Sequence, residues 1–170
     1  MALIVEDGSI VAGADSWASV VEADALLDAK GCVSWGTLQT VEKEAALRRA
    51  ATFMEQSFQM RWLGDRVSPD QVLSWPRSGA IVFGYQLGSA TIPEAVKAAQ
   101  IEMAFKAAAG DLNPDITTGV TKEKVDVIEL EYDAARTGAL DYRALRQALA
   151  PYLRDGGGGN GFSQARVQRS

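Results

Sequence analysis

The sequence predicts a mainly α-helical protein: a compact bundle of about four helices with a long aromatic-containing loop, one extended strand or hairpin arm and a flexible C-terminal tail. Alanine, which has the highest helix propensity, clusters at 45–51, 95–109 and 134–150. A run of glycines close to the C-terminus cannot pack into a core. We therefore expect a helical domain over 1–154 and a flexible, glycine-rich tail over 155–170.

The first helix is expected at 19–30, because apolar residues recur there at helical spacing. Ser19 and Glu22 form a Ser-x-x-Glu capping box at its start, and Gly31 provides its stop. Trp35 then follows in an expected loop, with its ring in the core.

The two longest helices are expected at 41–61 and 92–109, with Thr40 and Thr91 as their N-caps and Gly110 after the second. The segment 41–61 is the most strongly periodic in the chain, and its apolar face comprises Leu47, Ala51, Met54 and Phe58. The corresponding face of 92–109 comprises Ile92, Val96, Ala99 and Met103. Both faces are expected in the core.

Between these helices, residues 62–89 form a long segment rich in Gly, Pro and Ser, which is often the signature of a functional loop. It contains four aromatic residues, Trp62, Trp75, Phe83 and Tyr85. Aromatic residues at this density predict a loop that packs on the body of the domain.

A rigid elbow is expected within this loop. Trp75 precedes a proline and is therefore extended, Pro76 favours a turn, and Gly79 permits a positive φ. One interpretation is that the elbow presents Arg77. The other is that the stretch serves only to pack Trp75.

An extended arm is expected at about 120–132, where the apolar period changes from helical to alternating. A single strand in a helical protein has no internal partner, so it could pair with a neighbouring subunit. The residues expected at such a subunit contact are Val125, Val127, Ile128, Leu130 and Tyr132. The last helix is expected at 142–152, with Asp141 as its cap and Pro151 ending or distorting it.

Composition excludes several classes of function. The chain has 17 Lys and Arg against 22 Asp and Glu, a net charge of −5, which argues against attachment to DNA or anionic lipid by bulk charge. It has no histidine and one cysteine, Cys32, which removes histidine-dependent catalysis and metal sites as well as any intrachain disulfide. We expect no enzyme activity, no catalytic residue, no cofactor and no metal. The sequence also predicts no signal peptide and no membrane contact, and hence residence in a reducing cytoplasm.

Two motif matches are weaker than their structural alternatives. The glycines at 156, 158 and 161 fit a dinucleotide fingerprint, but no helix is expected after them. The acidic stretch 111–117 resembles the start of a calcium loop, but Ile116 and Lys122 stand where Gly and Glu are needed. A polar turn is the better interpretation of that stretch.

Basic residues offer a further alternative, single-stranded nucleic-acid binding, which needs a basic stripe interleaved with aromatic residues. Candidates occur along one expected helix and just beyond it, at Lys43, Arg48, Arg49, Arg61 and Arg66. Glutamates alternate with them, which favours a solvated helix surface. The tail carries another set, Phe162, Arg166, Val167 and Arg169, which is either a docking peptide that orders on a partner or a frayed terminus.

Six stretches in order resemble the small head–tail connector, adaptor or head-completion proteins of tailed bacteriophages. They are MALIVEDG at 1–8, SVVEADA at 19–25, EAALRRA at 44–50, WPRSGA at 75–80, IPEAV at 92–96 and KEKV at 122–125. A leucine pair at 26–27 replaces an expected aromatic pair. Proteins of this group are also often labelled "putative DnaT-like single-stranded DNA-binding protein".

The resemblance implies a structural virion protein that forms a ring, usually dodecameric, between the portal and the tail or neck. Such a ring extends the channel, so that double-stranded DNA passes without sequence-specific binding. The implied partners are other copies of the chain, the portal protein, and the next neck or tail-completion protein; assembly takes place in the cytoplasm of the bacterial host. The tail residues would dock on the portal. The alternative function is that of a single-stranded-DNA-binding or replication accessory protein.

Overall fold

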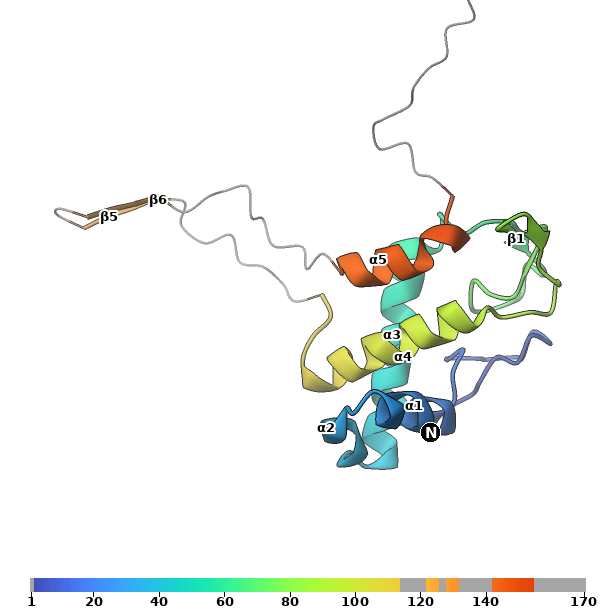
Figure 1. The fold of residues 1–170 in the computed structure, drawn as a ribbon, viewed down its shortest axis with the longest axis horizontal. Helices are drawn as coiled ribbons and strands as arrows, with labels where there is room; N and C mark the ends of the chain where they lie inside the picture. Colours follow the sequence, from blue (N-terminus) through green and yellow to red (C-terminus); the bar gives the residue numbers. More distant parts are fainter. Residues whose placement is uncertain (1, 114–121, 126–127, 132–141, 155–170) are drawn as a thin grey trace, which may run out of the picture.

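The computed structural model describes residues 2–113, 122–125, 128–131 and 142–154. As predicted, these ranges are mainly helical (Figure 1). The centre is a pair of long helices, α3 (Thr40–Phe58) and α4 (Glu94–Ala109), which pack on each other more extensively than any other two elements. Helix α1 (Val20–Ala29) packs against both, and α5 (Arg143–Leu149) packs against α4. Two short helical segments, α2 (Val33–Gly36) and the 3₁₀ turn η1 (Ala150–Tyr152), complete the helical set.

The start of α1 confirms the predicted capping box. Ser19 Oγ accepts a hydrogen bond from the backbone N–H of Glu22 at 3.2 Å, and Glu22 Oε2 accepts one from the backbone N–H of Ser19 at 2.7 Å. Gly31 follows the helix with a φ of 73°, the left-handed conformation that favours glycine. Trp35 is buried, as predicted, but it lies in helix α2 rather than in a loop.

The starts of α3 and α4 differ from the prediction. Helix α3 includes Thr40, and its N-cap is Gln39, whose backbone N–H donates to the Glu42 side chain at 2.7 Å. Helix α4 begins after Pro93, whose carbonyl accepts from the backbone N–H groups of Val96 at 2.9 Å and Lys97 at 3.3 Å. Capping propensity alone could not separate these neighbouring candidates.

The ends of α3 and α5 also refine the prediction. Helix α3 stops at Phe58, three residues before the expected end. Helix α5 stops at Leu149 and continues as the 3₁₀ turn that contains Pro151, so the predicted distortion by this proline is confirmed. The expected cap Asp141 lies outside the described residues.

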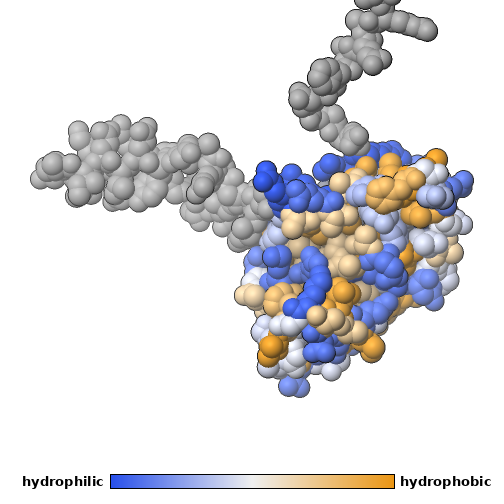
Figure 2. Space-filling view, in the orientation of Figure 1, coloured by the Kyte–Doolittle hydropathy of each residue, from blue (hydrophilic) through white to orange (hydrophobic). Residues whose placement is uncertain are grey.

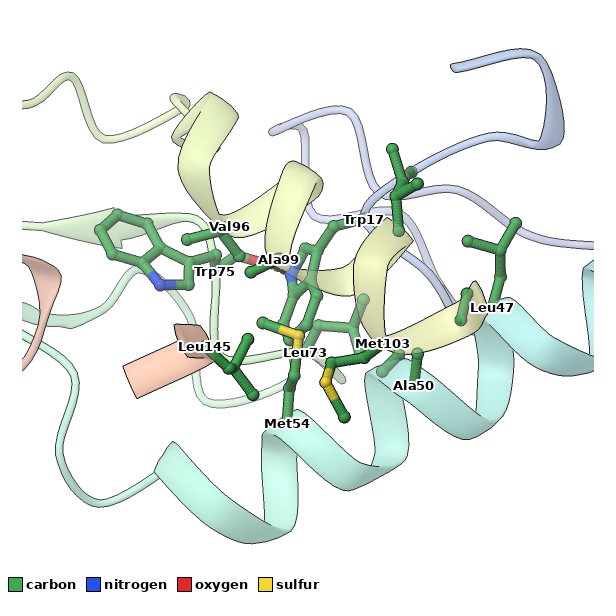
Figure 3. Close-up of a cluster of buried hydrophobic side chains, with 14 of the residues drawn as sticks. Trp17, Leu47, Ala50, Met54, Leu73, Trp75, Val96, Ala99, Met103 and Leu145 are labelled. Carbon is green, nitrogen blue, oxygen red and sulfur yellow. Dashed lines mark hydrogen bonds between the residues drawn. The ribbon is translucent and has the colours of Figure 1, made fainter. Parts of the chain in front are cut away.

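The core lies between α3, α4 and the segments that cover them (Figure 3). The predicted apolar faces of both long helices are buried in it. All four tryptophans are buried as well, namely Trp17, Trp35, Trp62 and Trp75. None of them lies in either long helix, and only Trp35 lies in a helix at all, so the loops contribute much of the apolar area that holds the domain together.

The segment 62–89 folds into two small antiparallel pairs rather than one irregular loop. β1 (Asp65–Arg66) pairs with β2 (Arg77–Ser78), and β3 (Ile81–Val82) pairs with β4 (Tyr85–Gln86). The prediction that its aromatic residues pack on the body holds for the two tryptophans only. Phe83 and Tyr85 are 79% and 78% exposed, because they lie at the tip of the β3–β4 hairpin.

The elbow has a different role from the one expected for Arg77. The Trp75–Pro76 peptide is cis, and Gly79 has the predicted positive φ, 69°. Arg77 is only 6% exposed and is not presented to solvent. Its guanidinium donates to three backbone carbonyls, those of Leu63 at 2.7 Å, Gly64 at 2.7 Å and Ser74 at 3.2 Å. An extended backbone can therefore turn its arginine inward, where carbonyls replace water.

The arm is an antiparallel hairpin of β5 (Lys122–Val125) and β6 (Ile128–Glu131). In its register Val125 is opposite Ile128 and Leu130 is opposite Glu123. Of the two forms expected for the arm, the hairpin is therefore confirmed, and the inference that its strand has no partner within the chain is wrong. Among the proposed contact residues, Val127 and Tyr132 lie outside the described residues, as do Phe162, Arg166, Val167 and Arg169 of the tail. No helix in the described ranges is long and apolar enough to cross a membrane.

Candidate nucleic-acid interface

Four arginines surround one hollow of about 390 Å³ on the surface of the domain. They are Arg61, Arg143, Arg146 and Arg154, and Gln147, Ala150 and Leu153 complete the lining. All four arginines are exposed. We call this feature the arginine groove. No aspartate or glutamate is among the described residues that line it.

The groove forms because two segments far apart in the sequence meet as an antiparallel bridge. Trp62 is opposite Leu153, and the backbone N–H of Leu63 donates to the carbonyl of Tyr152 at 2.9 Å. The backbone N–H of Arg154 donates in turn to the carbonyl of Arg61. The bridge therefore sets these two arginines side by side at the end of α3.

Aromatic packing beneath the bridge holds it in place. The ring of Trp75 packs edge-on against Trp62 and Tyr152, with centroid distances of 5.9 and 6.3 Å. Phe58, at the end of α3, packs on Trp62 at 5.8 Å. The buried side of the predicted elbow thus supports the surface on which the arginines lie.

Helix α5 supplies the other two arginines. Leu145 and Leu149 are buried and attach the helix to the core. The groove-lining positions 143, 146, 147 and 150 recur at the spacing of one helical face, opposite these leucines. An amphipathic helix thereby turns its basic side toward the groove.

Among the described residues, the contacts of Arg61, Arg143 and Arg154 leave these three arginines available for an anion. Arg154 Nη2 donates to the carbonyl of Gly64 at 2.8 Å and lies 3.3 Å from Asp65 Oδ1. The Asp65 side chain is 87% exposed, and a solvated pair of this kind contributes little, so a phosphate can replace it. In the described part of the chain, neither Arg61 nor Arg143 has a carboxylate partner.

The charge of one groove arginine, Arg154, affects the pKa of the buried Arg77. Burial lowers the pKa of Arg77, and the positive charge of Arg154 lowers that pKa further. The carboxylate of Asp65 acts in the opposite direction. Guanidinium groups remain charged at neutral pH and bind phosphate oxygens in a bidentate manner. The groove is therefore suited to an anion with several charges rather than to acid–base chemistry.

Only one of the basic residues predicted from the sequence lines this groove, Arg61. Lys43 is 2.9 Å from Asp24 and lies over the ring of Trp35, and Arg48 is 2.6 Å from Asp15, so both are engaged within the domain. Arg66 donates to the backbone carbonyls of Gln71 and Val72. Sequence reasoning missed the other three groove arginines; the spacing of Arg143 and Arg146 on one helical face was the signal that could have found two of them.

The described residues show no sign of a metal or thiol site. No group of three His, Cys, Asp or Glu side chains gathers within these ranges. Of the calcium-like stretch, the part up to residue 113 is a turn in which the backbone N–H of Asn113 donates to Asp111 at 3.0 Å. Cys32 is half-buried and free.

Comparison with known proteins places the whole chain in one family. The model of the family described as "Putative DnaT-like ssDNA binding protein" matches residues 1–170. No curated protein and no solved structure matches the chain. The family description agrees with the label attached to the resemblance in the sequence, whereas nothing in these comparisons supports the identity of a phage connector.

Proposed function

We propose, because the chain belongs to the family of putative DnaT-like ssDNA binding proteins, that it binds single-stranded DNA and that the arginine groove holds the phosphate backbone. The observation that carries the proposal is the convergence of Arg61, Arg143, Arg146 and Arg154 on one hollow without an acidic lining residue. Arginines from two segments of an acidic chain, far apart in the sequence, meet there. If these arginines were only solvated charges on a helix surface, there would be no reason for them to converge on one hollow.

The groove fits a single strand better than a duplex. Four arginines neutralise at most about four phosphates, which predicts a slope of about −3 for the logarithm of affinity against the logarithm of salt concentration. The whole chain has a net charge of −5 with the four groove arginines included, so the rest of it is more acidic still and would repel the second strand of a duplex. Binding is therefore expected to be modest in affinity, sensitive to salt and independent of sequence.

Fluorescence anisotropy with a labelled oligothymidylate of roughly 15 nucleotides tests the proposal across a salt series. The double variant Arg61→Glu/Arg143→Glu is expected to lose affinity at least tenfold and to reduce the salt slope to about −1.4. Arg49→Glu is the control, because Arg49 is an exposed arginine of helix α3 that does not line the groove. No saturable binding by the unaltered chain, or an equal loss in the control, would overturn the proposal.

A second candidate function is the structural connector implied by the ordered motifs of the sequence. The acidic balance of the chain favours it, since a channel wall past which DNA moves must not grip the phosphate backbone. In this function the chain would form a ring with other copies, bind the portal protein and the next neck or tail-completion protein, and reside in the virion.

Co-sedimentation with portal rings encoded by the same genome tests the connector. The full chain and a version ending at Arg154 are compared. Stoichiometric binding by the full chain only would establish a connector with a docking tail, and binding by both would establish a connector that docks through the domain. No binding by either, with salt-sensitive binding of oligonucleotides, would leave single-stranded DNA binding as the function.

A further inference from the structure

The tip of the β3–β4 hairpin displays apolar side chains that the fold does not use. Phe83 and Tyr85 are 79% and 78% exposed, and Ile81 is 60% exposed. Val82, by contrast, is buried and anchors the hairpin. We propose that Phe83 and Tyr85 form a base-stacking tip of the same single-stranded-DNA site, so that one strand is held by its phosphates in the arginine groove and by its bases on the hairpin. This inference rests on the proposed function of the groove.

The backbone of the tip is unfavourable for the residue that occupies it. Val82 pairs with Tyr85, which leaves Phe83 and Gly84 as a two-residue loop with φ values of 51° and 83°. Positive φ at both central residues is the requirement of a type I′ turn, for which Asn-Gly is preferred. A bulky aromatic residue with positive φ is an outlier. The glycine suits this turn, whereas the phenylalanine does not.

Packing offers no reason for a phenylalanine at this position. The aromatic contacts of the described residues join Phe53, Phe58, Trp62, Trp75 and two tyrosines, and the ring of Phe83 takes part in none of them. An exposed aromatic ring in an unfavourable backbone conformation is typical of a residue kept for a contact outside the chain.

The hairpin and the groove share a residue at their base. The carbonyl of Gly64 accepts from Arg154 at 2.8 Å, which joins it to the groove. On its other side, a Cβ at Gly64 would lie 2.7 Å from the backbone nitrogen of Ala80, so only glycine allows this close approach to the root of the hairpin. The backbone carbonyl of Ala80 accepts a hydrogen bond from the backbone N–H of Leu87 at 2.9 Å, which closes the hairpin.

The length of the hairpin beyond this root sets how far its tip can reach. The tip lies three residues beyond Ala80, a reach of roughly 10 Å at the rise of a β-strand. Figure 2 shows strongly hydrophilic and strongly hydrophobic residues side by side at the end of the domain where α5 and the β1 region lie in Figure 1.

The chemistry of the tip matches nucleotide bases. Residues 78–93 contain no charged side chain, so the hairpin offers ring faces and no ionic contact. Arginines that track a phosphate backbone, with aromatic rings on which bases stack, are the two parts of a sequence-independent single-strand site. The arginine groove favours a nucleic acid over an apolar protein partner. Binding of a protein by the tip is the alternative that the experiment below can detect.

The variant Phe83→Asn separates stacking from folding. Asparagine tolerates the positive φ that this turn requires. The melting temperature of the Phe83→Asn variant is therefore expected to equal or exceed that of the unaltered protein. The affinity of the full chain for labelled oligothymidylate is expected to fall by about fivefold to a hundredfold, the effect of losing one stacked base. Phe83→Trp is the matched control and is expected to retain binding.

A second oligonucleotide of the same length, in which the bases are replaced by abasic sites, separates base stacking from a purely structural role of Phe83. A structural role alone would not change the difference in affinity between the two oligonucleotides. The unaltered chain is expected to bind it more weakly than oligothymidylate, whereas Phe83→Asn binds the two alike. The salt slope of Phe83→Asn stays at that of the unaltered chain, because the arginine contacts remain.

The outcomes distinguish this inference from the function on which it rests. If Arg61→Glu/Arg143→Glu loses binding but Phe83→Asn binds as the unaltered chain does, the stacking tip is wrong and the groove stands. If the unaltered chain binds no DNA, both fall. If Phe83→Asn keeps its affinity for DNA but loses self-association by light scattering, the tip contacts protein and the inference is overturned.

Discussion

A single buried side chain, Gln100, joins three parts of the domain, so the fold is expected to be sensitive to its substitution. It lies in α4 with no exposed surface. Its Oε1 accepts from the backbone N–H groups of Trp17 at 2.9 Å and Ala18 at 3.0 Å. Its Nε2 donates to Ser16 Oγ at 2.7 Å and to the carbonyl of Leu47 at 3.0 Å. The segment 16–18 and both long helices therefore depend on one amide.

Replacing Gln100 by methionine keeps the length of the side chain and removes all four hydrogen bonds. The buried N–H of Trp17 loses the acceptor that Gln100 provides, at a cost of about 1–3 kcal/mol, while that of Ala18 keeps Ser16 Oγ at 3.2 Å. The remaining bonds contribute about 1 kcal/mol each, and the smaller desolvation penalty of a thioether offsets part of the loss. We expect the free energy of unfolding to fall by about 2–4 kcal/mol.

Urea unfolding followed by circular dichroism measures this change. Gln59→Met is the matched control, because Gln59 is exposed at the end of α3; its expected effect is within about 0.5 kcal/mol. Hydrogen exchange at the amide of Trp17 should also become faster in Gln100→Met. A free energy of unfolding within about 0.5 kcal/mol of the unaltered protein would refute the reasoning, since it would mean that the amide network does not hold the segment.

Two further predictions follow from the same structure. Arg77→Met should lower the free energy of unfolding by about 2–4 kcal/mol, measured by urea unfolding, because the buried carbonyl of Ser74 and two partly buried carbonyls lose their charged donor; no change would contradict the assigned role. Glu22→Gln tests a pH dependence: burial alone would raise the pKa of Glu22, but the hydrogen bond from the Ser19 amide and the charge of Lys97 outweigh it, so the folded pKa lies below 4.5. The stabilisation by Glu22 is therefore present above about pH 4.5 and lost as the pH falls through the folded pKa, by less than about 1 kcal/mol for this half-exposed pair. Unfolding titrations should show a shallower acid loss in Glu22→Gln than in the unaltered protein, and parallel curves would count against the pair.

Helical periodicity predicted much of the fold, because the long helices bury an apolar face that the sequence displays directly. Leu47, Met54, Val96 and Met103 are buried as their spacing predicts. The exact caps were less predictable, since Thr91 and Pro93 are both acceptable starts, and it is the carbonyl of Pro93 that accepts the first hydrogen bonds of the helix.

In the segment 62–89, local composition was not enough to predict which aromatic rings are buried. Trp75 and Phe83 lie in the same segment of similar composition, yet one ring is fully buried and the other is exposed. The difference arises from contacts with Trp62 and Tyr152, which lie 13 and 77 positions away along the chain. Composition predicted aromatic packing but could not assign it to a particular ring.

The arginine groove has the same origin and could not be derived from a basic stretch of sequence. Arg61 and Arg154 become neighbours through a bridge between segments about ninety residues apart. The sequence candidates that looked basic, Lys43 and Arg48, are neutralised by Asp24 and Asp15. Charge density along the chain was therefore a poor guide to charge density on the surface.

This difference between chain and surface reconciles the acidic composition of the chain with the DNA-binding site that we propose. Charges on a surface act over about 8–10 Å at physiological salt, so a strand in the groove is governed by its four arginines rather than by the net charge of −5. At low salt the screening length exceeds the size of the domain, and the acidic remainder repels DNA at a distance. Association with oligothymidylate should therefore be slower than for a basic single-strand binder at low salt, while dissociation remains controlled by the groove. Stopped-flow rates that instead rise steeply as salt is reduced would show that steering by a wider basic surface, and not the local groove, governs capture.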